Sequence, residues 1–193
     1  MKQEIYAMVK EAKQYESFHE AWEDCDNVNE MFRLLEKAKC DRSKLILCLC
    51  NIAEHVLHFF EEKYPDDVRP RRAIEAARKV AENETEETLE AALDAARAAE
   101  AAKSAVYDDA LDATVLAARA AFYVAAYVIF SAIDRTAKDY AFRAAEAAAN
   151  AVYEVVDGAA ATVSYAAERQ WQRDCVRRYF PNPFEEKEES HAC

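Results

Sequence analysis

The chain has 193 residues, a net charge of −12 at pH 7 and one glycine, Gly158. A glycine-rich phosphate-binding loop and an all-β fold with glycine turns are therefore excluded. Alanine, the best helix former, makes up roughly a fifth of the residues. This composition predicts an all-α fold, a single-domain helical bundle of about six to eight helices over residues 1–180. An acidic, mobile tail is expected over residues 181–193.

The charge balance also limits the partners that we expect. An acidic surface repels the phosphates of nucleic acids and anionic membranes, so neither is an expected direct partner. The longest uncharged run, residues 120–133, is too short to span a membrane and predicts a buried central helix. Charge throughout the first residues argues against a signal peptide, which indicates a cytoplasmic protein whose six cysteines remain thiols.

In the first third of the chain we expect one or two helices over residues 2–24 and another over residues 28–39. A break follows, with Asp41 as the N-cap of a long helix over residues 42–63. Apolar residues recur in this helix every three or four positions and widen into a broad stripe, which predicts that it is largely buried.

Prolines mark the next boundary. Pro65 ends the long helix and Pro70 lies near the start of the following one, which ends near Glu82. Thr85 is expected to cap the helix after it. The rest of the chain predicts four alanine-rich helices, with Asp108 as a candidate cap, over residues 86–107, 109–133, 135–156 and 159–178.

The long helix 42–63 carries the only polar stripe that suggests a metal. Glu54, His58 and Glu62 are spaced i, i+4, i+8, with His55 beside them. The Glu-x-x-His pairs of di-iron bundles and the H-E-x-x-H zinc motif are nevertheless missing from this helix, so we predict no metal and no cofactor. One glycine also cannot build a nucleophile elbow, and no catalytic residue is predicted.

A charged segment lies between the prolines and the helix that follows. Asp66 and Asp67 precede that helix and can cap its free N–H groups, and Arg71 and Glu75 are spaced i, i+4 to form an ion pair. Arg69 could reach a carboxylate on another helix. The favoured interpretation is a structural staple, and the alternative is a charged recognition edge.

Three segments carry a family resemblance. The early segment is Ala21-Trp22-Glu23 with Cys25, and the late one is Glu168-Arg169-Gln170-Trp171-Gln172. The central match, a D-x-R-P-R segment leading into an I-E-x-A-R helix, falls on Asp67, Arg69, Pro70, Arg71, Ile74, Glu75 and Arg78. Together they resemble a family of immunity proteins of bacterial polymorphic-toxin systems. The residues expected to carry the structural motif are Asp67, Arg69, Pro70, Arg71, Glu75 and Trp171.

The resemblance implies a protein that binds and neutralises a toxin or nuclease stoichiometrically and is not an enzyme. It assigns no binding residues. The acidic charge favours a partner with a basic surface, since opposite charges steer association. The carboxylates expected to bind it are Asp66, Asp67, Glu82, Glu84, Glu86, Glu87 and Glu90.

Three alternatives remain open from the sequence. A phage-borne acidic inhibitor could occupy a host defence nuclease, of the CRISPR type or another, by mimicking nucleic acid. A small helical enzyme or metal-binding protein is a different class of function. The third alternative is a helical module that assembles only with itself, for example as a homodimer.

Overall fold

The computed structural model describes residues 18–105, 112–133, 138–155 and 159–184. Within these ranges the secondary structure is α-helical, without strands, and its eight helices confirm the predicted all-α bundle. They are α2 (Phe18–Glu23), α3 (Val28–Ala38), α4 (Arg42–Lys63), α5 (Arg69–Glu82), α6 (Glu86–Ala105), α7 (Ala113–Ile133), α8 (Lys138–Glu154) and α9 (Ala159–Tyr179).

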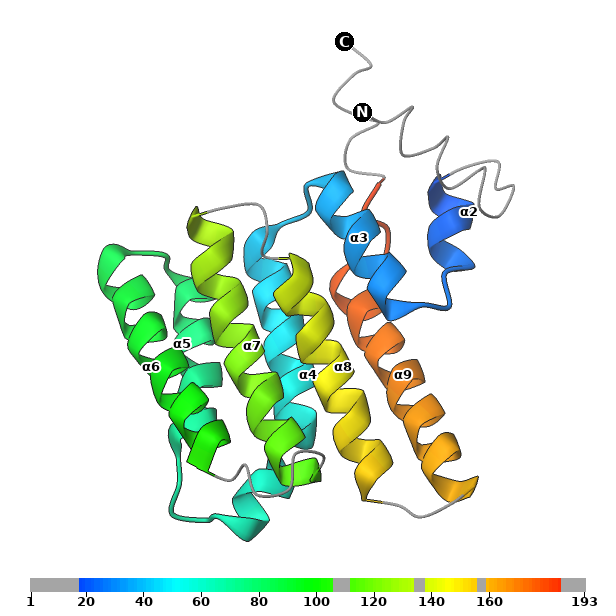
Figure 1. Ribbon diagram of the computed structural model, residues 1–193. Helices are drawn as coiled ribbons and strands as arrows, with labels where there is room; N and C mark the ends of the chain where they lie inside the picture. The colour runs from blue at the N-terminus through cyan, green and yellow to red at the C-terminus, as the bar shows by residue number, and fades with distance from the viewer. Residues whose placement is uncertain (1–17, 106–111, 134–137, 156–158, 185–193) are drawn as a thin grey trace.

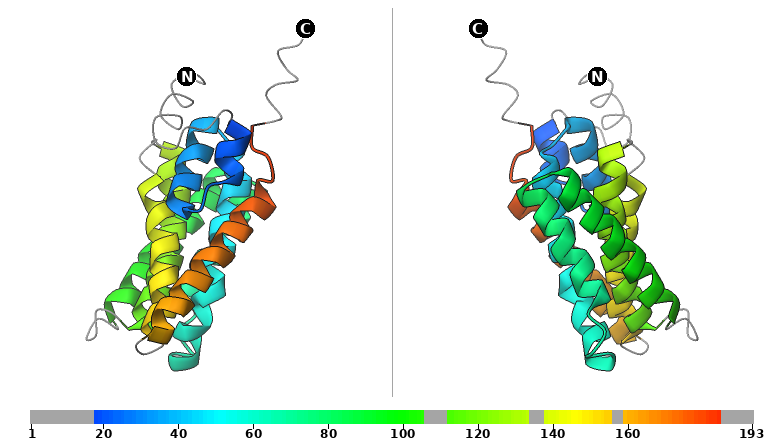
Figure 2. Two further views of the ribbon diagram at one scale, coloured as in Figure 1. Left: turned by 90° about the vertical axis from the view of Figure 1, so that its right-hand side faces the viewer. Right: turned by 90° about the vertical axis from the view of Figure 1, so that its left-hand side faces the viewer.

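The six longer helices form two layers. One layer contains α6, α7 and α8, and the other contains α5, α4 and α9, as Figure 1 shows from the front and Figure 2 from the two sides. α4 and α7 lie at the centres of their layers and pack on each other, and α3 packs against α8 and α9 near one end of the bundle. The outward face of α4 therefore lies between α5 and α9.

Side chains at the helix starts explain where several helices begin. Asp41 accepts a hydrogen bond from the backbone N–H of Lys44 at 3.1 Å, which confirms the predicted cap of α4. α7 is preceded by Asp112, whose carboxylate accepts from the N–H of Thr114 at 2.8 Å. The predicted cap Asp108 lies outside the described residues.

α3 ends without a glycine. Its C-cap residue, Lys39, takes the left-handed conformation with φ 51° and ψ 50°. The N–H of Lys39 donates to Glu36 O at 3.0 Å, and the N–H of Cys40 donates to Leu35 O at 3.1 Å. These bonds satisfy the last carbonyls of the helix in the way that a glycine at this position usually allows.

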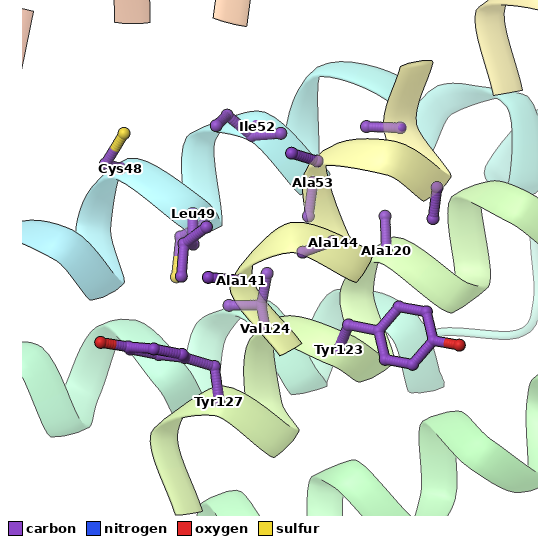
Figure 3. Packing of buried hydrophobic residues seen from close by; sticks show 14 of the residues in the cluster. Cys48, Leu49, Ile52, Ala53, Ala120, Tyr123, Val124, Tyr127, Ala141 and Ala144 are labelled. Atoms are coloured by element: carbon purple, nitrogen blue, oxygen red, sulfur yellow. The ribbon is translucent and has the colours of Figure 1, made fainter. Parts of the chain in front are cut away.

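The core differs between the two layers. The buried residues of α4 include Leu49 and Ile52, whereas α7 and α8 contribute many alanines, such as Ala120 and Ala144, which pack beside them (Figure 3). α4 and α7 are each long and apolar enough to cross a membrane by length and composition alone. More than half of each such stretch is buried inside the bundle, which accounts for its apolar character.

The short helix α2 docks on the C-terminal part of α9. Arg177 Nη2 donates to the carbonyl oxygens of Glu23 at 2.8 Å and Cys25 at 3.0 Å. After α9, Phe184 packs against Trp22 with ring centroids 6.2 Å apart. The chain therefore contacts the core as far as Phe184, and residues 185–193 of the predicted tail lie outside the described residues.

Candidate partner-binding site

Five of the predicted carboxylates gather around the connection between α5 and α6. We call this group the acidic corner; it consists of Glu82, Glu84, Glu86, Glu87 and Glu90, all of them exposed. The cap of α6 comes from other residues. Thr85 Oγ1 accepts from the N–H of Thr88 at 3.1 Å, and Thr88 Oγ1 accepts from the N–H of Thr85 at 2.9 Å. This reciprocal cap confirms the predicted role of Thr85, so the corner supplies more negative charge than capping requires.

One member of the acidic corner has an internal partner. Glu84 forms an ion pair with Arg42, the first residue of α4. Arg42 is itself held by α7, because its Nε donates to Ser131 Oγ at 2.8 Å and its Nη2 donates to Val128 O at 2.7 Å. Glu84 therefore ties the corner to the bundle. Within the part of the chain that the structure describes, the other four glutamates form no ion pair.

The remaining two predicted carboxylates, Asp66 and Asp67, come just before the first residue of α5 and so lie at the other end of that helix from the acidic corner. Asp66 is exposed. Asp67 accepts from Arg69 Nε at 2.8 Å, Arg69 Nη2 at 2.6 Å and the backbone N–H of Arg69 at 3.1 Å. These hydrogen bonds hold the pKa of Asp67 below its ordinary value. The predicted carboxylates thus form two separate groups rather than one surface.

The charged motif at the start of α5 makes different contacts from those expected. Arg69, which the sequence allowed to reach a carboxylate on another helix, pairs instead with Asp67, two residues before it, because both side chains leave the same turn. Arg71 was expected to pair with Glu75 but turns toward α4, where it binds Glu61, with Nη2 2.8 Å from Oε2, and Glu54, with Nη1 3.2 Å from Oε1. Glu75 is exposed and Pro70 is buried in the first turn of α5.

Arg71 belongs to a row of polar contacts that crosses the outward face of α4, from α5 to α9. We call this row the polar ladder. Arg78 of α5 binds Glu54, and its Nη2 also donates to Asn51 Oδ1 at 2.8 Å. Asn51 Nδ2 in turn donates to Tyr179 Oη of α9 at 2.7 Å. The ladder therefore joins three helices side by side.

A second rung of the ladder is built around His55. Its ring stacks on Trp171 with centroids 3.8 Å apart and 11° between the planes. His55 Nε2 lies 3.2 Å from Glu168 Oε2, and this hydrogen bond raises the pKa of His55 above its ordinary value. Glu168 is buried and also accepts from Gln172 Nε2 at 3.0 Å. The buried carboxylate is thus compensated from two sides.

Two of the three segments that carry the family resemblance, the central one and the late one, meet on this face. Arg71 and Arg78 come from the D-x-R-P-R and I-E-x-A-R segment, and Glu168 and Trp171 come from the late segment. Their common neighbour is α4. The sequence analysis considered His55 only beside a metal stripe and missed its contacts with Glu168 and Trp171, because these partners lie far away in the chain.

The polar ladder and the acidic corner differ in whether their carboxylates are paired with positive charges. Carboxylates of the polar ladder are matched by arginines or by His55, so the ladder holds α5, α4 and α9 together. Four glutamates of the acidic corner have no such match among the described residues and stay available to a positively charged surface. In the described ranges no group of three or more His, Cys, Asp or Glu residues could hold a metal ion.

Comparison with known proteins gives one result. The family model described as "Imm-5 like putative immunity protein" matches residues 35–178, which is well over half of the chain. A search of curated proteins gave no significant match. A search of solved structures also gave none. The matched region runs from the last turn of α3 almost to the end of α9, and it contains the acidic corner and all of the polar ladder except Tyr179. The chain belongs to the Imm-5-like immunity protein family.

Proposed function

We propose that this protein neutralises a toxin in the cytoplasm by binding it stoichiometrically, with the acidic corner against a basic surface of the toxin. Family membership implies an immunity role and a protein partner, and it favours binding over catalysis. The observation that carries the proposal is the state of the corner's charges: Glu82, Glu86, Glu87 and Glu90 are exposed and form no ion pair within the described ranges.

Position on the helix explains only part of this charge. Glu86 and Glu87 lie in the first turn of α6, where the helix dipole favours carboxylates. Glu90 lies beyond that turn, where the dipole has little effect, and Glu82 ends the preceding helix, where the dipole disfavours a carboxylate. Carboxylates concentrated at such positions do little to stabilise the helices. Binding of a positively charged partner explains them better. A toxin that binds nucleic acid would present such a basic surface, and covering that surface would exclude its substrate.

The first experiment asks whether the protein protects cells. A candidate toxin domain is sought in the genes beside this one and expressed in a test bacterium with and without this chain, and growth is measured. Protection accompanied by a 1:1 complex of the purified proteins in light scattering supports the proposal. Continued growth arrest, with no complex formed, would contradict it.

The second experiment tests the acidic corner itself. Replacing Glu86, Glu87 and Glu90 by glutamine should slow association by about threefold to tenfold and change dissociation less, because distant charges act mainly on the encounter rate. Association of the unaltered protein should also slow steeply between about 10 and 150 mM salt, as the screening length shrinks to about 8 Å. Glu84 is left in place because it holds Arg42.

A second triple variant serves as the control and has the same net charge as the variant of Glu86, Glu87 and Glu90. Glu36, Glu62 and Glu154 are exposed residues of α3, α4 and α8, outside the acidic corner. Their replacement by glutamine also removes three charges. If both triple variants slow association equally, net charge rather than the corner is responsible. An association rate that does not depend on salt would exclude electrostatic capture.

A further inference from the structure

Two cysteines from helices far apart in the chain touch inside the bundle. Cys48 of α4 and Cys175 of α9 have their sulfur atoms 4.0 Å apart, and both side chains are buried. The other thiols with described contacts bind backbone carbonyls instead. Cys50 Sγ donates to Ile74 O at 3.7 Å, and Cys25 Sγ donates to Asn27 O at 3.5 Å. Among these four thiols, Cys48 and Cys175 are the two whose sulfur atoms are in contact with each other.

The surroundings distinguish the two sulfurs of the pair. Cys175 lies one helical turn from Trp171 and from Tyr179, so it sits just beneath the polar ladder. Its hydrogen bond with Cys48, and then the positive charges of Arg178 and His55, lower the pKa of the Cys175 thiol. The same hydrogen bond and burial raise the pKa of Cys48. Cys175 is therefore the more acidic thiol of the pair.

We propose that Cys48 and Cys175 are a redox-active dithiol that closes to a disulfide when the protein meets a peroxide. The Cys175 thiolate attacks one peroxide oxygen, an S–O bond forms, the O–O bond breaks, and the leaving hydroxide takes a proton to become water. The Cys48 sulfur then attacks the sulfenic acid sulfur, and an S–S bond forms as the second water leaves with the Cys48 proton. Two thiols are oxidised and one peroxide is reduced to two waters.

The geometry requires only a small adjustment. A disulfide bond is about 2.05 Å long, so the sulfurs must approach by about 2 Å. Rotation of the two cysteine side chains, with a slight shift of α9 toward α4, would bring the sulfurs together. A small uncharged oxidant can enter the packed interior during local fluctuations, whereas a bulky thiol reagent cannot. The resulting bond fastens α9 to α4 below the polar ladder, next to Tyr179 and its partner Asn51.

The experiment uses the full-length protein and hydrogen peroxide as the probe. After treatment, the protein is denatured, free thiols are blocked, and peptides are mapped by mass spectrometry. We expect a loss of about 2 Da and a cross-linked peptide pair containing Cys48 and Cys175, both reversed by dithiothreitol. The melting temperature should rise by about 5–15 °C, because the bond closes a long loop of the unfolded chain.

Cys50 provides the matched control. It lies on α4 close to Cys48 and is equally buried, but its sulfur points to the Ile74 carbonyl. Cys50→Ala should form the bond and gain thermal stability as the unaltered protein does. Cys175→Ala should form no disulfide within the core and show no such gain. If Cys175→Ala fails to fold, the peptide map of the unaltered protein still decides.

Two results would overturn the proposal. One is a peptide map in which peroxide oxidises other cysteines and leaves Cys48 and Cys175 as thiols. The other is a Cys48–Cys175 bond that forms only in denaturant, since the pair would then have no native reactivity.

Discussion

The imidazole of His55 lies flat on the indole of Trp171, with ring centroids 3.8 Å apart and 11° between the planes. An imidazolium gains from this stacking because an aromatic face attracts a cation. The protonated ring also neutralises Glu168, whose side chain is only 2% exposed. Both contacts therefore favour the same protonation state, in line with the raised pKa of His55.

The first prediction follows from that raised pKa. The stabilising effect of His55 should be fully present below about pH 6.5, its pKa in the unfolded chain. It should be lost as the pH rises through the higher pKa of the folded protein. Because the His55 side chain is 43% exposed, we expect the loss to stay below about 1 kcal/mol. Urea unfolding between about pH 5.5 and pH 8.5 measures this loss.

The control for this prediction is His55→Gln, which keeps a polar side chain but cannot gain a proton. The difference in unfolding free energy between the two proteins should shrink as the pH rises. A difference that grows with pH would mean that neutral His55 is the stabilising form.

A second prediction tests whether Arg71 pairs with carboxylates of α4, as in the structure, or with Glu75 of its own helix, as the sequence spacing suggests. Arg71→Ala should lower the free energy of unfolding by about 1 kcal/mol, because it removes the contacts to Glu61 and Glu54 that join α5 to α4. Glu75→Ala should change it by less than about 0.5 kcal/mol, since Glu75 is exposed on α5. Denaturant titrations of both variants provide the comparison. Equal losses of unfolding free energy in the two variants would instead support an ion pair between Arg71 and Glu75.

The third prediction concerns Lys39, which has φ 51°. A side chain with a β-carbon is strained in the left-handed region, and glycine is not. Lys39→Gly should therefore raise the free energy of unfolding. The net gain should be about 0.5 kcal/mol, because the greater flexibility of glycine in the unfolded chain cancels part of the relieved strain. Lys79→Gly, on the exposed face of α5, is the control and should cost up to about 1 kcal/mol. Thermal melts of the two variants should move in opposite directions.

The fourth prediction concerns thiol labelling. Burial raises the pKa of Cys50 to about 12, so almost none of its thiolate exists at neutral pH. Cys48 is buried as well. A bulky maleimide should modify both slowly in the native protein and quickly in urea, whereas Cys193, in the charged C-terminal segment, should react at once. Mass spectrometry of timed samples tests this order, and rapid native labelling of Cys50 would contradict its burial.

The helices were the predictable part of this molecule because their signals are local. Asp41 and Thr85 cap helices as expected, since each bonds a backbone N–H within three residues. The α4 helix has the predicted bounds because its apolar spacing and the following proline both act over a few residues. Local propensity and tertiary packing agree at these positions.

The polar contacts were less predictable because they depend on which helices become neighbours. The spacing of Arg71 and Glu75 is visible in the sequence, yet the packing of α4 on α5 offers Arg71 two closer carboxylates. The stacking of His55 on Trp171 joins α4 to α9, and no local pattern predicts it. The acidic corner was found from its sequence because its residues are neighbours along the chain. Its role in binding stays a prediction.

The buried face of α6 consists of alanines, which limits how firmly this helix is held in the bundle. The described buried residues of α6 are Ala92, Ala96, Ala99 and Ala102, so the helix attaches through methyl groups and hides little apolar area. Its amide hydrogens should therefore exchange with deuterium before those of α4, whose buried side chains are large. A partner seated on the acidic corner would hold the first turns of α6 in place. Slower exchange at those amides would then map the bound surface without a structure of the complex.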